Sequence, residues 1–285
     1  MRSGLSAFVR ERFPIWVTGP LSLVLFGAPA VLVRLDVSDW LRGLATTFMA
    51  LLVLRMVDDL SDIEVDAVTS PERGLVSGRI EPGHLKAWSA VFFLVMLVLN
   101  PSPVVFMFLF LGALFYFVYY RVRRGIVAWQ PLLVNMVFPL VPVYACLLGG
   151  KKPSISVILL SIFIWSAVVG HDYGHSVSES GATGQASAIT FYSHLGPRPC
   201  AVLGALFYLC SLVTGYLAWL EGGLGILFLI ALAIMSLVIA RIFLALLKNP
   251  ARSVARRLYV PGFLFFMVPM ATIIVQGVAS AITGR

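Results

Sequence analysis

Residues 40–66 read WLRGLATTFMALLVLRMVDDLSDIEVD and carry two signals that decide the fold. Residues 40–60 are mostly apolar, and their length matches the roughly 20 residues that a transmembrane helix needs. The stretch then ends in four aspartates and one glutamate between residues 58 and 66. Because acids are costly inside a bilayer, the pattern predicts a membrane-spanning helix with a polar site at one end.

The composition of the whole chain agrees with this prediction. Hydrophobic residues make up 60% of the 285 residues and charged residues only 12%, and the mean hydropathy is +0.96. A soluble domain carries about 25% charged residues. We therefore exclude a soluble globular protein and expect an all-α integral membrane protein, because a bilayer accepts an apolar outer surface.

Apolar runs of spanning length recur along the chain, and we expect nine of them in a single domain over residues 1–285. A proline-rich turn at residues 100–103 separates the third run from the fourth, because proline ends a helix and restricts the residue before it. The expected spans are 15–35, 40–60, 86–101, 103–121, 128–148, 155–173, 199–220, 223–247 and 259–281.

Nine spans place the N-terminus on the same side as the long connections 61–85 and 174–198. Most lysines and arginines outside the spans fall on that side. Since cytoplasmic loops are enriched in these residues, we expect the N-terminus and the long loops to be cytoplasmic. The net charge of +8 then reflects topology and contact with anionic membrane lipids rather than nucleic-acid binding.

The acids after residue 57 share one face if the helix continues through them. At about 100° per residue, Asp58, Asp59, Asp62 and Asp66 lie with Arg55 on one stripe, and Glu64 points away. Carboxylates crowded on one face need a cation, and hard oxygen ligands suit Mg²⁺, which also bridges to phosphate oxygens. The alternative is an exposed acidic helix end that Arg55 and water stabilise.

A second polar stripe ends the sixth span. Asp172, His175, Ser176 and Glu179 fall on one face of the expected helix, and Asp172 with Glu179 would suit a second Mg²⁺. The alternative is a hydrogen-bonded helix end. Basic residues accompany both stripes on the same side of the membrane, and arginine forks onto phosphate oxygens. These arginines, which also serve as topology signals, are Arg73, Arg79, Arg121, Arg123 and Arg124.

The first stripe resembles a signature of the UbiA superfamily of intramembrane prenyltransferases. The family pattern NDxxDxxxD is matched by Asp59, Asp62 and Asp66, with Asp58 in place of the asparagine. The pattern RPLxxG follows in the family. Here it is matched at Arg73, Leu75 and Gly78, and Gly74 replaces the proline.

The second family signature, DxxDxxxD, is only partly retained. Asp172 matches its first position, while His175 and Glu179 replace the other two acids. Residues 195–198 (Leu-Gly-Pro-Arg) resemble the segment that follows it. The family also carries a tyrosine and basic residues after the fourth span, where this chain has Tyr119, Tyr120, Arg121 and Arg124.

The resemblance implies nine helices in a ring around a central cavity, with a polar cytoplasmic cap and a lateral opening for lipophilic substrates. It implies that the cap holds Mg²⁺ and a prenyl diphosphate. The metal ligands would be Asp58, Asp59, Asp62, Asp66, Asp172 and Glu179. The diphosphate would contact Arg55, Arg73, Arg79, Arg121 and Arg124, and the catalytic residues would be Asp172, Arg73 and Tyr119.

The fate of the prenyl cation leaves two enzymatic readings open. An acceptor in the cavity, such as an aromatic ring, gives prenyl transfer, which we expect. Without an acceptor, internal attack gives a cyclic terpene, and the altered second signature keeps this alternative open. An ion-coupled transporter is a third hypothesis, because acids within membrane helices mark ion pathways, but transporter sites lie near the bilayer centre. A membrane scaffold would not account for the aspartates.

Overall fold

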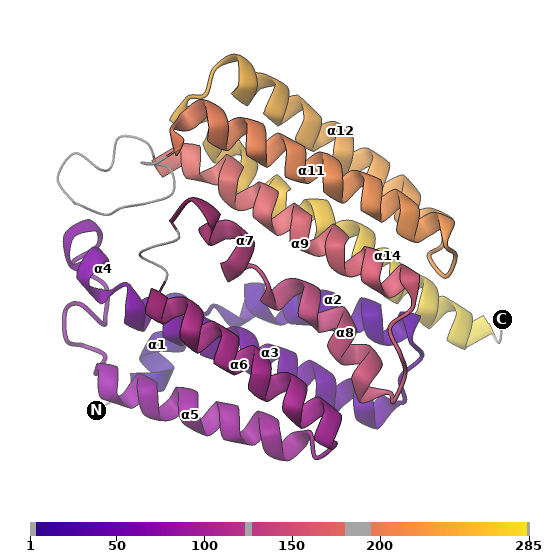
Figure 1. The fold of residues 1–285 in the computed structure, drawn as a ribbon, viewed down its shortest axis with the longest axis horizontal. Helices are drawn as coiled ribbons and strands as arrows, with labels where there is room; N and C mark the ends of the chain where they lie inside the picture. Colours follow the sequence, from indigo (N-terminus) through magenta and orange to yellow (C-terminus); the bar gives the residue numbers. More distant parts are fainter. Residues whose placement is uncertain (1–3, 123–126, 180–194, 284–285) are drawn as a thin grey trace.

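The computed structural model describes residues 4–122, 127–179 and 195–283, and over these residues the chain is an all-helical bundle without strands (Figure 1). Nine helices in the described ranges are long and apolar enough to cross a membrane, which confirms the expected fold class. They are α2 (Ile15–Leu32), α3 (Val37–Ser61), α5 (Pro82–Leu99), α6 (Pro103–Val122), α7–α8 (Gln130–Leu148), α9 (Ile155–Ser176), α11 (Pro197–Leu220), α12 (Ile226–Lys248) and α13–α14 (Arg252–Thr283).

Shorter elements complete the chain, and helix boundaries follow its prolines. The short elements are α1 (Gly4–Arg12), α4 (Ile63–Thr69), η2 (Val127–Trp129), η3 (Val177–Glu179) and η4 (Arg256–Leu258). Helix α5 begins at Pro82, four residues before the expected span, because proline suits the first helical position. The fifth span divides into α7 (Gln130–Val134) and α8 (Val137–Leu148), since Pro139 has no N–H to donate to the carbonyl of Asn135.

The acidic stripe does not lie on one continuous helix, which corrects the expectation for Asp58, Asp59, Asp62 and Asp66. Helix α3 ends at Ser61, the chain bends at Asp62, and α4 starts at Ile63. The Ser61 hydroxyl donates to the carbonyl oxygen of Asp58 at 2.7 Å. Such a side-chain bond competes with the helical backbone and bends it. Asp66 therefore belongs to the separate short helix α4, which leads into the loop that carries Arg73 and Arg79.

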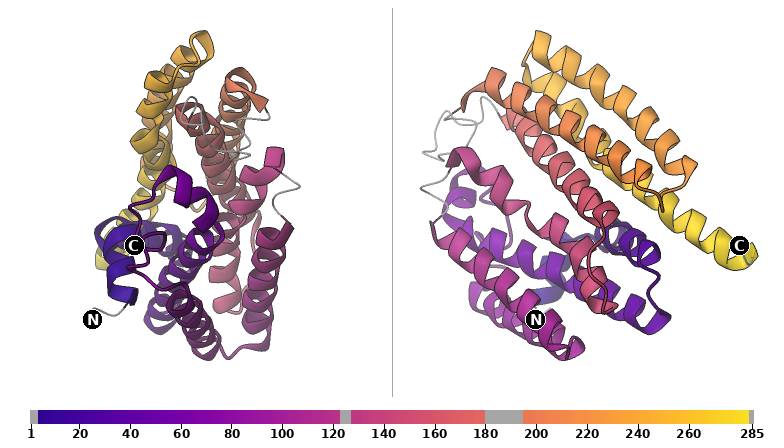
Figure 2. Two further views of the ribbon diagram at one scale, coloured as in Figure 1. Left: turned by 90° about the vertical axis from the view of Figure 1, so that its left-hand side faces the viewer. Right: turned by 45° about the vertical axis from the view of Figure 1, so that its right-hand side comes forward.

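Helix α9 is the packing centre of the bundle. The helices α11, α12 and α14 lie together on one side of it, and α3, α5 and α6 lie on the other (Figure 2). Gly170 of α9 and Gly204 of α11 meet backbone to backbone. A Cβ atom on Gly204 would stand 3.0 Å from the carbonyl oxygen of Gly170 and 3.0 Å from the amide nitrogen of Gly174. Small residues of this kind let membrane helices approach closely.

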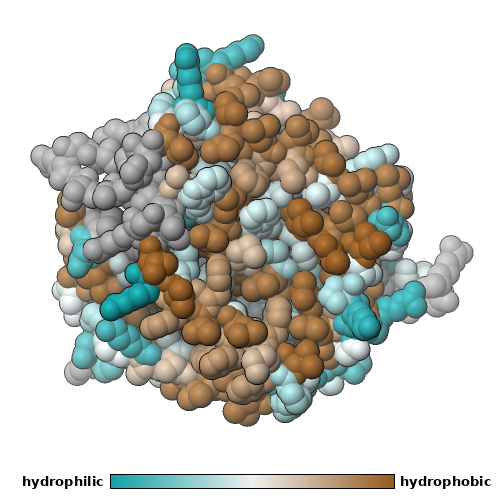
Figure 3. Space-filling view, viewed as in Figure 1, coloured by the Kyte–Doolittle hydropathy of each residue, from teal (hydrophilic) through white to brown (hydrophobic). Residues whose placement is uncertain are grey.

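The short helices α1 and α4 lie at one end of the bundle (Figure 1). In Figure 1 the C-terminal ends of α3, α6 and α9 lie at the left with α1 and α4, while the C-terminus lies at the right. The face in Figure 3 is brown across its middle, and most teal side chains lie at its margins. An apolar waist with polar ends is the surface that a bilayer requires.

The close contact between α9 and α11 makes a stability prediction. We expect Gly204→Ala to lower the free energy of unfolding by about 1–3 kcal/mol, because the new methyl group meets backbone that cannot move aside. The thermal unfolding midpoint of the detergent-purified protein measures this effect. Gly19→Ala in α2 is the matched control, since its Cβ would approach only Ile15, at 4.0 Å; equal midpoints for the two variants would contradict the packing argument.

Candidate functional site

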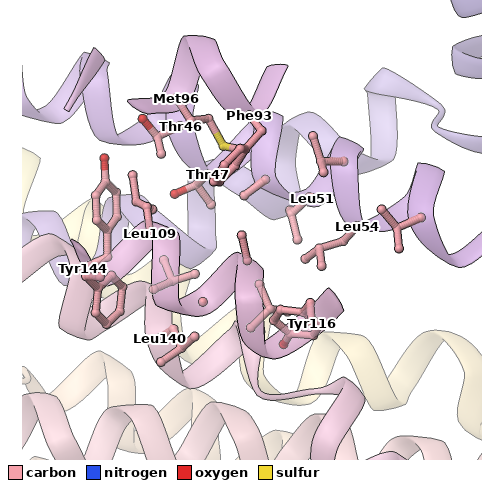
Figure 4. Close-up of a pocket in the computed structure, with 18 of the residues that line it drawn as sticks. Thr46, Thr47, Leu51, Leu54, Phe93, Met96, Leu109, Tyr116, Leu140 and Tyr144 are labelled. Atoms are coloured by element: carbon pink, nitrogen blue, oxygen red, sulfur yellow. The ribbon is translucent and has the colours of Figure 1, made fainter. Parts of the chain in front are cut away.

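An apolar cavity of about 250 Å³ lies between α3, α5, α6 and α8. Figure 4 shows Thr46, Met96 and Tyr144 at one end of it and Leu54 and Tyr116 toward the other. Its wall on α3 reaches Val57, the residue before the first aspartate. The cavity therefore runs from the acidic end of α3 into the apolar waist, bounded by four of the nine spanning helices.

The first two aspartates sit where the cavity meets the polar end. Asp58 accepts a hydrogen bond from the Tyr120 hydroxyl at 3.3 Å and lies 3.6 Å from the Arg55 guanidinium. Asp59 is almost fully buried, with 4% of its side chain exposed. The Arg12 guanidinium forks onto both of its carboxylate oxygens, at 2.7 and 2.8 Å. Arg55 makes a third contact with Asp59, at 3.1 Å.

Asp66 is bound by Arg73, the arginine expected to hold a diphosphate. Burial opposes the charge on Arg73, but the hydrogen bond and negative charge of Asp66 outweigh it, so the pKa of Arg73 is raised. Asp59 and Asp66 line a small second hollow of about 10 Å³ with Arg12, Arg73 and Glu11. Asp62 is half-buried at the bend between α3 and α4.

The N-terminal helix α1 ties the acids to the loop after α4. Glu11 accepts a hydrogen bond from the backbone N–H of Gly74 at 2.7 Å and lies 3.4 Å from Arg79. The loop closes with a bond from the Ile80 amide to the Gly74 carbonyl, and Gly78 takes a φ of 73° that favours glycine. The matched glycine of the first family signature thus has a backbone role in shaping the arginine loop.

A chain of contacts connects the two predicted signatures around the cavity. The Tyr116 hydroxyl of α6 donates to the carbonyl of Val134 in α7 at 3.3 Å. The next residue, Asn135, donates from its side chain to Asp172 of α9 at 2.7 Å. Tyr119 is buried, with 3% exposed, and its ring packs edge-on against Tyr120 at 5.0 Å. Tyr116 rather than Tyr119 lines the cavity.

Two residues of the second signature, Asp172 and His175, contact different parts of the bundle. Asp172 faces α7 through Asn135, whereas the His175 ring lies 5.3 Å from that of Tyr259 on α14. The Glu179 backbone belongs to η3. Arg121 is exposed near the end of α6, and Arg123 and Arg124 lie outside the described residues.

The donor chemistry of the acids suits a hard cation, because carboxylate oxygens are the ligands that Mg²⁺ prefers. Asp59 and Asp66 share one hollow, which fits such a site. Over the described part of the chain, however, no group of three or more His, Cys, Asp or Glu side chains is gathered closely enough to hold a metal. Arginines neutralise these acids instead, so a metal would have to exchange with guanidinium groups.

Sequence reasoning missed the contributions of Arg12, Glu11 and Asn135. In the sequence, Arg12 is one of many basic residues that indicate membrane topology, and its partner Asp59 lies 47 residues away. One signal in the sequence does single out this segment: Phe8 and Phe13 flank three consecutive charged residues. Both phenylalanines are buried against Ile80 and Leu85, which holds α1 at the site.

Comparison with known proteins identifies a family and a curated relative that this chain resembles. The family model described as "UbiA prenyltransferase family" matches residues 20–268. A digeranylgeranylglyceryl phosphate synthase from Hyperthermus butylicus (strain DSM 5456 / JCM 9403 / PLM1-5) is 29% identical over 169 residues, which are 54% of this chain and 56% of that protein. The chain thus matches little more than half the length of this curated relative.

Solved structures share the fold at lower identity. The apo structure of a UbiA homolog from Aeropyrum pernix K1 superposes with a TM-score of 0.74 at 18% identity, over 94% of this chain and 98% of that one. A UbiA homolog from Archaeoglobus fulgidus bound to DMAPP and Mg²⁺ gives a TM-score of 0.60 at 15% identity, over 94% and 99%. These likenesses support the nine-helix architecture.

The Arg12–Asp59 pair makes a second stability prediction. We expect Arg12→Ala to lower the free energy of unfolding by about 2 kcal/mol, because it leaves a buried carboxylate with Arg55 as its remaining cationic contact. Thermal unfolding in detergent measures the loss. Arg10→Ala, on the exposed side of the same helix, is the control. If both variants melt at the wild-type temperature, the ion pair does not stabilise this end of the bundle.

Proposed function

This chain belongs to the UbiA prenyltransferase family, and from that premise we propose that it transfers a prenyl group from a prenyl diphosphate to a lipophilic, aromatic acceptor in the presence of Mg²⁺. The observation that carries the proposal is the junction of the apolar cavity with Asp58 and Tyr120, one turn beyond Tyr116. A prenyl diphosphate has the same division into a hydrocarbon tail and a charged head.

The charged head would be held by the acids and arginines of the polar end. We propose Asp58, Asp59, Asp62 and Asp66 as ligands of one Mg²⁺, and Asp172 and Glu179 as ligands of a second. When bound, Mg²⁺ would neutralise charge on the departing diphosphate. The arginines proposed to contact the diphosphate oxygens are Arg55, Arg73, Arg79, Arg121 and Arg124.

The charges at the site support a model in which Asp59 and Asp66 exchange their arginine partners for Mg²⁺ when the substrate binds. Asp59 and Asp66 are paired with guanidinium groups. A divalent cation on the carboxylates would release these groups, and a diphosphate supplies the oxygens onto which arginine forks. Arg73 is proposed as catalytic for this reason, because it lies at the hollow that Asp59 and Asp66 share.

The cavity wall would stabilise the prenyl cation and keep water away from it. Ionisation of an allylic diphosphate gives a cation that water would capture, so the wall has to exclude water. Aromatic faces stabilise cations; Tyr116 lines the cavity and Tyr119 is packed one turn further on. Asp172, oriented by Asn135, is the proposed group that orients the acceptor and takes its proton.

The known relatives support this class of reaction. The curated relative is named for the synthesis of digeranylgeranylglyceryl phosphate, and one UbiA homolog of the same fold is bound to DMAPP and Mg²⁺. We propose the same type of donor for this chain. We also propose that the end carrying α1 and α4 faces the cytoplasm, in line with the excess of arginine and lysine there.

A terpene cyclase of the same superfamily is the second candidate. The altered second signature favours it, because histidine replaces the middle acid and the His175 ring lies beside Tyr259 of α14, while Asp172 is bonded to Asn135 after α7. A cyclase needs the first set of acids and the apolar cavity, and no acceptor. Ion transport is a weaker fit, since the acids lie at the end of α3 and in α4 rather than at mid-span.

The metal role of the first stripe is testable at Asp62. We expect Asp62→Asn to lower Mg²⁺-dependent turnover of a prenyl diphosphate by about 10–100-fold, because a metal ligand would lose its charge. Glu64→Gln is the matched control: this acid is exposed on α4 and lies two residues away. Equal turnover by Asp62→Asn and wild type would remove the metal role from the stripe, and EDTA should abolish activity in every active variant.

A product assay separates transfer from cyclisation. The purified protein is incubated with a prenyl diphosphate and Mg²⁺, with and without an aromatic acceptor, and products are identified by mass spectrometry. We expect a prenylated acceptor and little product in its absence. A cyclic hydrocarbon or alcohol formed without acceptor would establish the cyclase reading instead.

A further inference from the structure

We infer that the cavity admits prenyl chains of up to three isoprene units, and that a hydrogen-bonded floor of Tyr144, Asn100 and Thr46 excludes a fourth. This inference rests on the proposed function and narrows its substrate class. The floor lies at the end of the cavity farthest from Asp58, where Figure 4 shows Thr46, Met96 and Tyr144 together.

Asn100 joins three helices at this floor. Its side-chain amide donates to the Thr46 hydroxyl of α3 at 3.0 Å and to the Met96 carbonyl of α5 at 2.7 Å. Its side-chain oxygen accepts from the Tyr144 hydroxyl of α8 at 2.8 Å. Asn100 is 1% exposed, Thr46 1% and Tyr144 4%. Opening the floor would leave these buried polar groups unsatisfied, which is costly away from water.

The Tyr144 ring is also supported from behind. Its centroid lies 5.8 Å from that of Phe26 in α2. Phe26 is fully buried and rests on Gly43, where even a methyl group would stand only 1.9 Å from its ring. Phe26 therefore blocks movement of the Tyr144 ring toward α2. A chain that reaches Tyr144 meets a fixed surface.

The depth of the cavity sets the number of units. From Val57 to Thr46 the wall on α3 rises by eleven residue steps, roughly 16 Å at about 1.5 Å per step. From Val137 to Tyr144 the wall on α8 rises by seven steps, or roughly 10 Å. An extended isoprene unit adds about 5 Å, since it contributes four chain bonds of roughly 1.5 Å in a zigzag. Two to three units fill this depth.

The volume gives the lower end of the range that the depth allows. A dry protein cavity of about 150 Å³ holds one benzene ring, which has six carbons. The cavity of about 250 Å³ therefore has room for ten or somewhat more carbons when packed to the same density. A geranyl group has ten carbons and fills this volume. A farnesyl group has fifteen, the upper end of the range that the depth allows, and a geranylgeranyl group, with twenty, exceeds both estimates.

Binding of unreactive analogues tests the floor without relying on turnover. Prenyl thiolodiphosphates with one to four isoprene units are titrated with Mg²⁺ against the detergent-purified full chain, and inorganic pyrophosphate serves as the probe for the head group alone. We expect affinity to rise several-fold with each unit up to three and to fall about tenfold at four. Turnover of the matching diphosphates is measured in parallel.

Substitutions at the floor and in the wall should move this limit in opposite directions. Tyr144→Ala should let the four-unit analogue bind as well as the three-unit analogue. Tyr144→Phe keeps the ring and should keep the limit. Ala50→Leu adds bulk in the α3 wall one turn above Thr46 and should lower the limit by one unit. The last variant keeps the test decisive if Tyr144→Ala fails to fold, and pyrophosphate should bind all of them alike.

The outcomes separate this inference from the proposed function. Unlimited binding of longer chains by wild type, or an unchanged limit in both Tyr144→Ala and Ala50→Leu, overturns the floor even where turnover is observed. A limit at three units without turnover of authentic diphosphates supports the floor and contradicts the transferase proposal. Failure of every prenyl analogue to bind with Mg²⁺ overturns both.

Discussion

The polar end of the bundle depends on the neutralisation of Asp59. This carboxylate ends an apolar helix and is almost fully buried, and an isolated charge there would be prohibitively costly. The fork from Arg12, together with the contact from Arg55, makes its position tolerable. The same constraint explains why α1 lies against α3 and why the loop after α4 folds back to meet both. Under the proposed function, Arg55 and Arg73, which neutralise acids in the free protein, would also contact the bound diphosphate.

The nine spans could be predicted from the sequence because bilayer thickness dictates the length of an apolar helix, and the prolines at residues 101 and 103 mark the turn between the third and fourth spans. The acids could be predicted as a cluster, since they are close in sequence. The bend at Asp62 could not, because it arises from the Ser61 hydroxyl bonding to the Asp58 carbonyl. The Arg12–Asp59 and Asn135–Asp172 contacts were equally inaccessible, since they join residues 47 and 37 positions apart.

The two halves of the bundle have different packing. Around α9, α11 and α14, glycines and large aromatic side chains interlock, as at Gly204 and Phe243 or Gly215 and Phe163. Around α3, α5, α6 and α8, the side chains leave a cavity whose polar contacts lie at its two ends. A tightly packed half can hold α9 and Asp172 steady while the other half accommodates a flexible hydrocarbon. This division fits an enzyme that must orient one part of its substrate and enclose another.

The pairing of Arg12 with Asp59 also constrains how the protein assembles as it leaves the ribosome. Helix α1 emerges first, but its partner follows 47 residues later, after α2 and nearly all of α3 have been made. Phe8 and Phe13 stay uncovered until α3 and the residues up to Leu85 of α5 have been made, because these supply the apolar surface that buries them. Closure of the acidic site therefore has to follow the synthesis of α3 and of the loop that leads to α5.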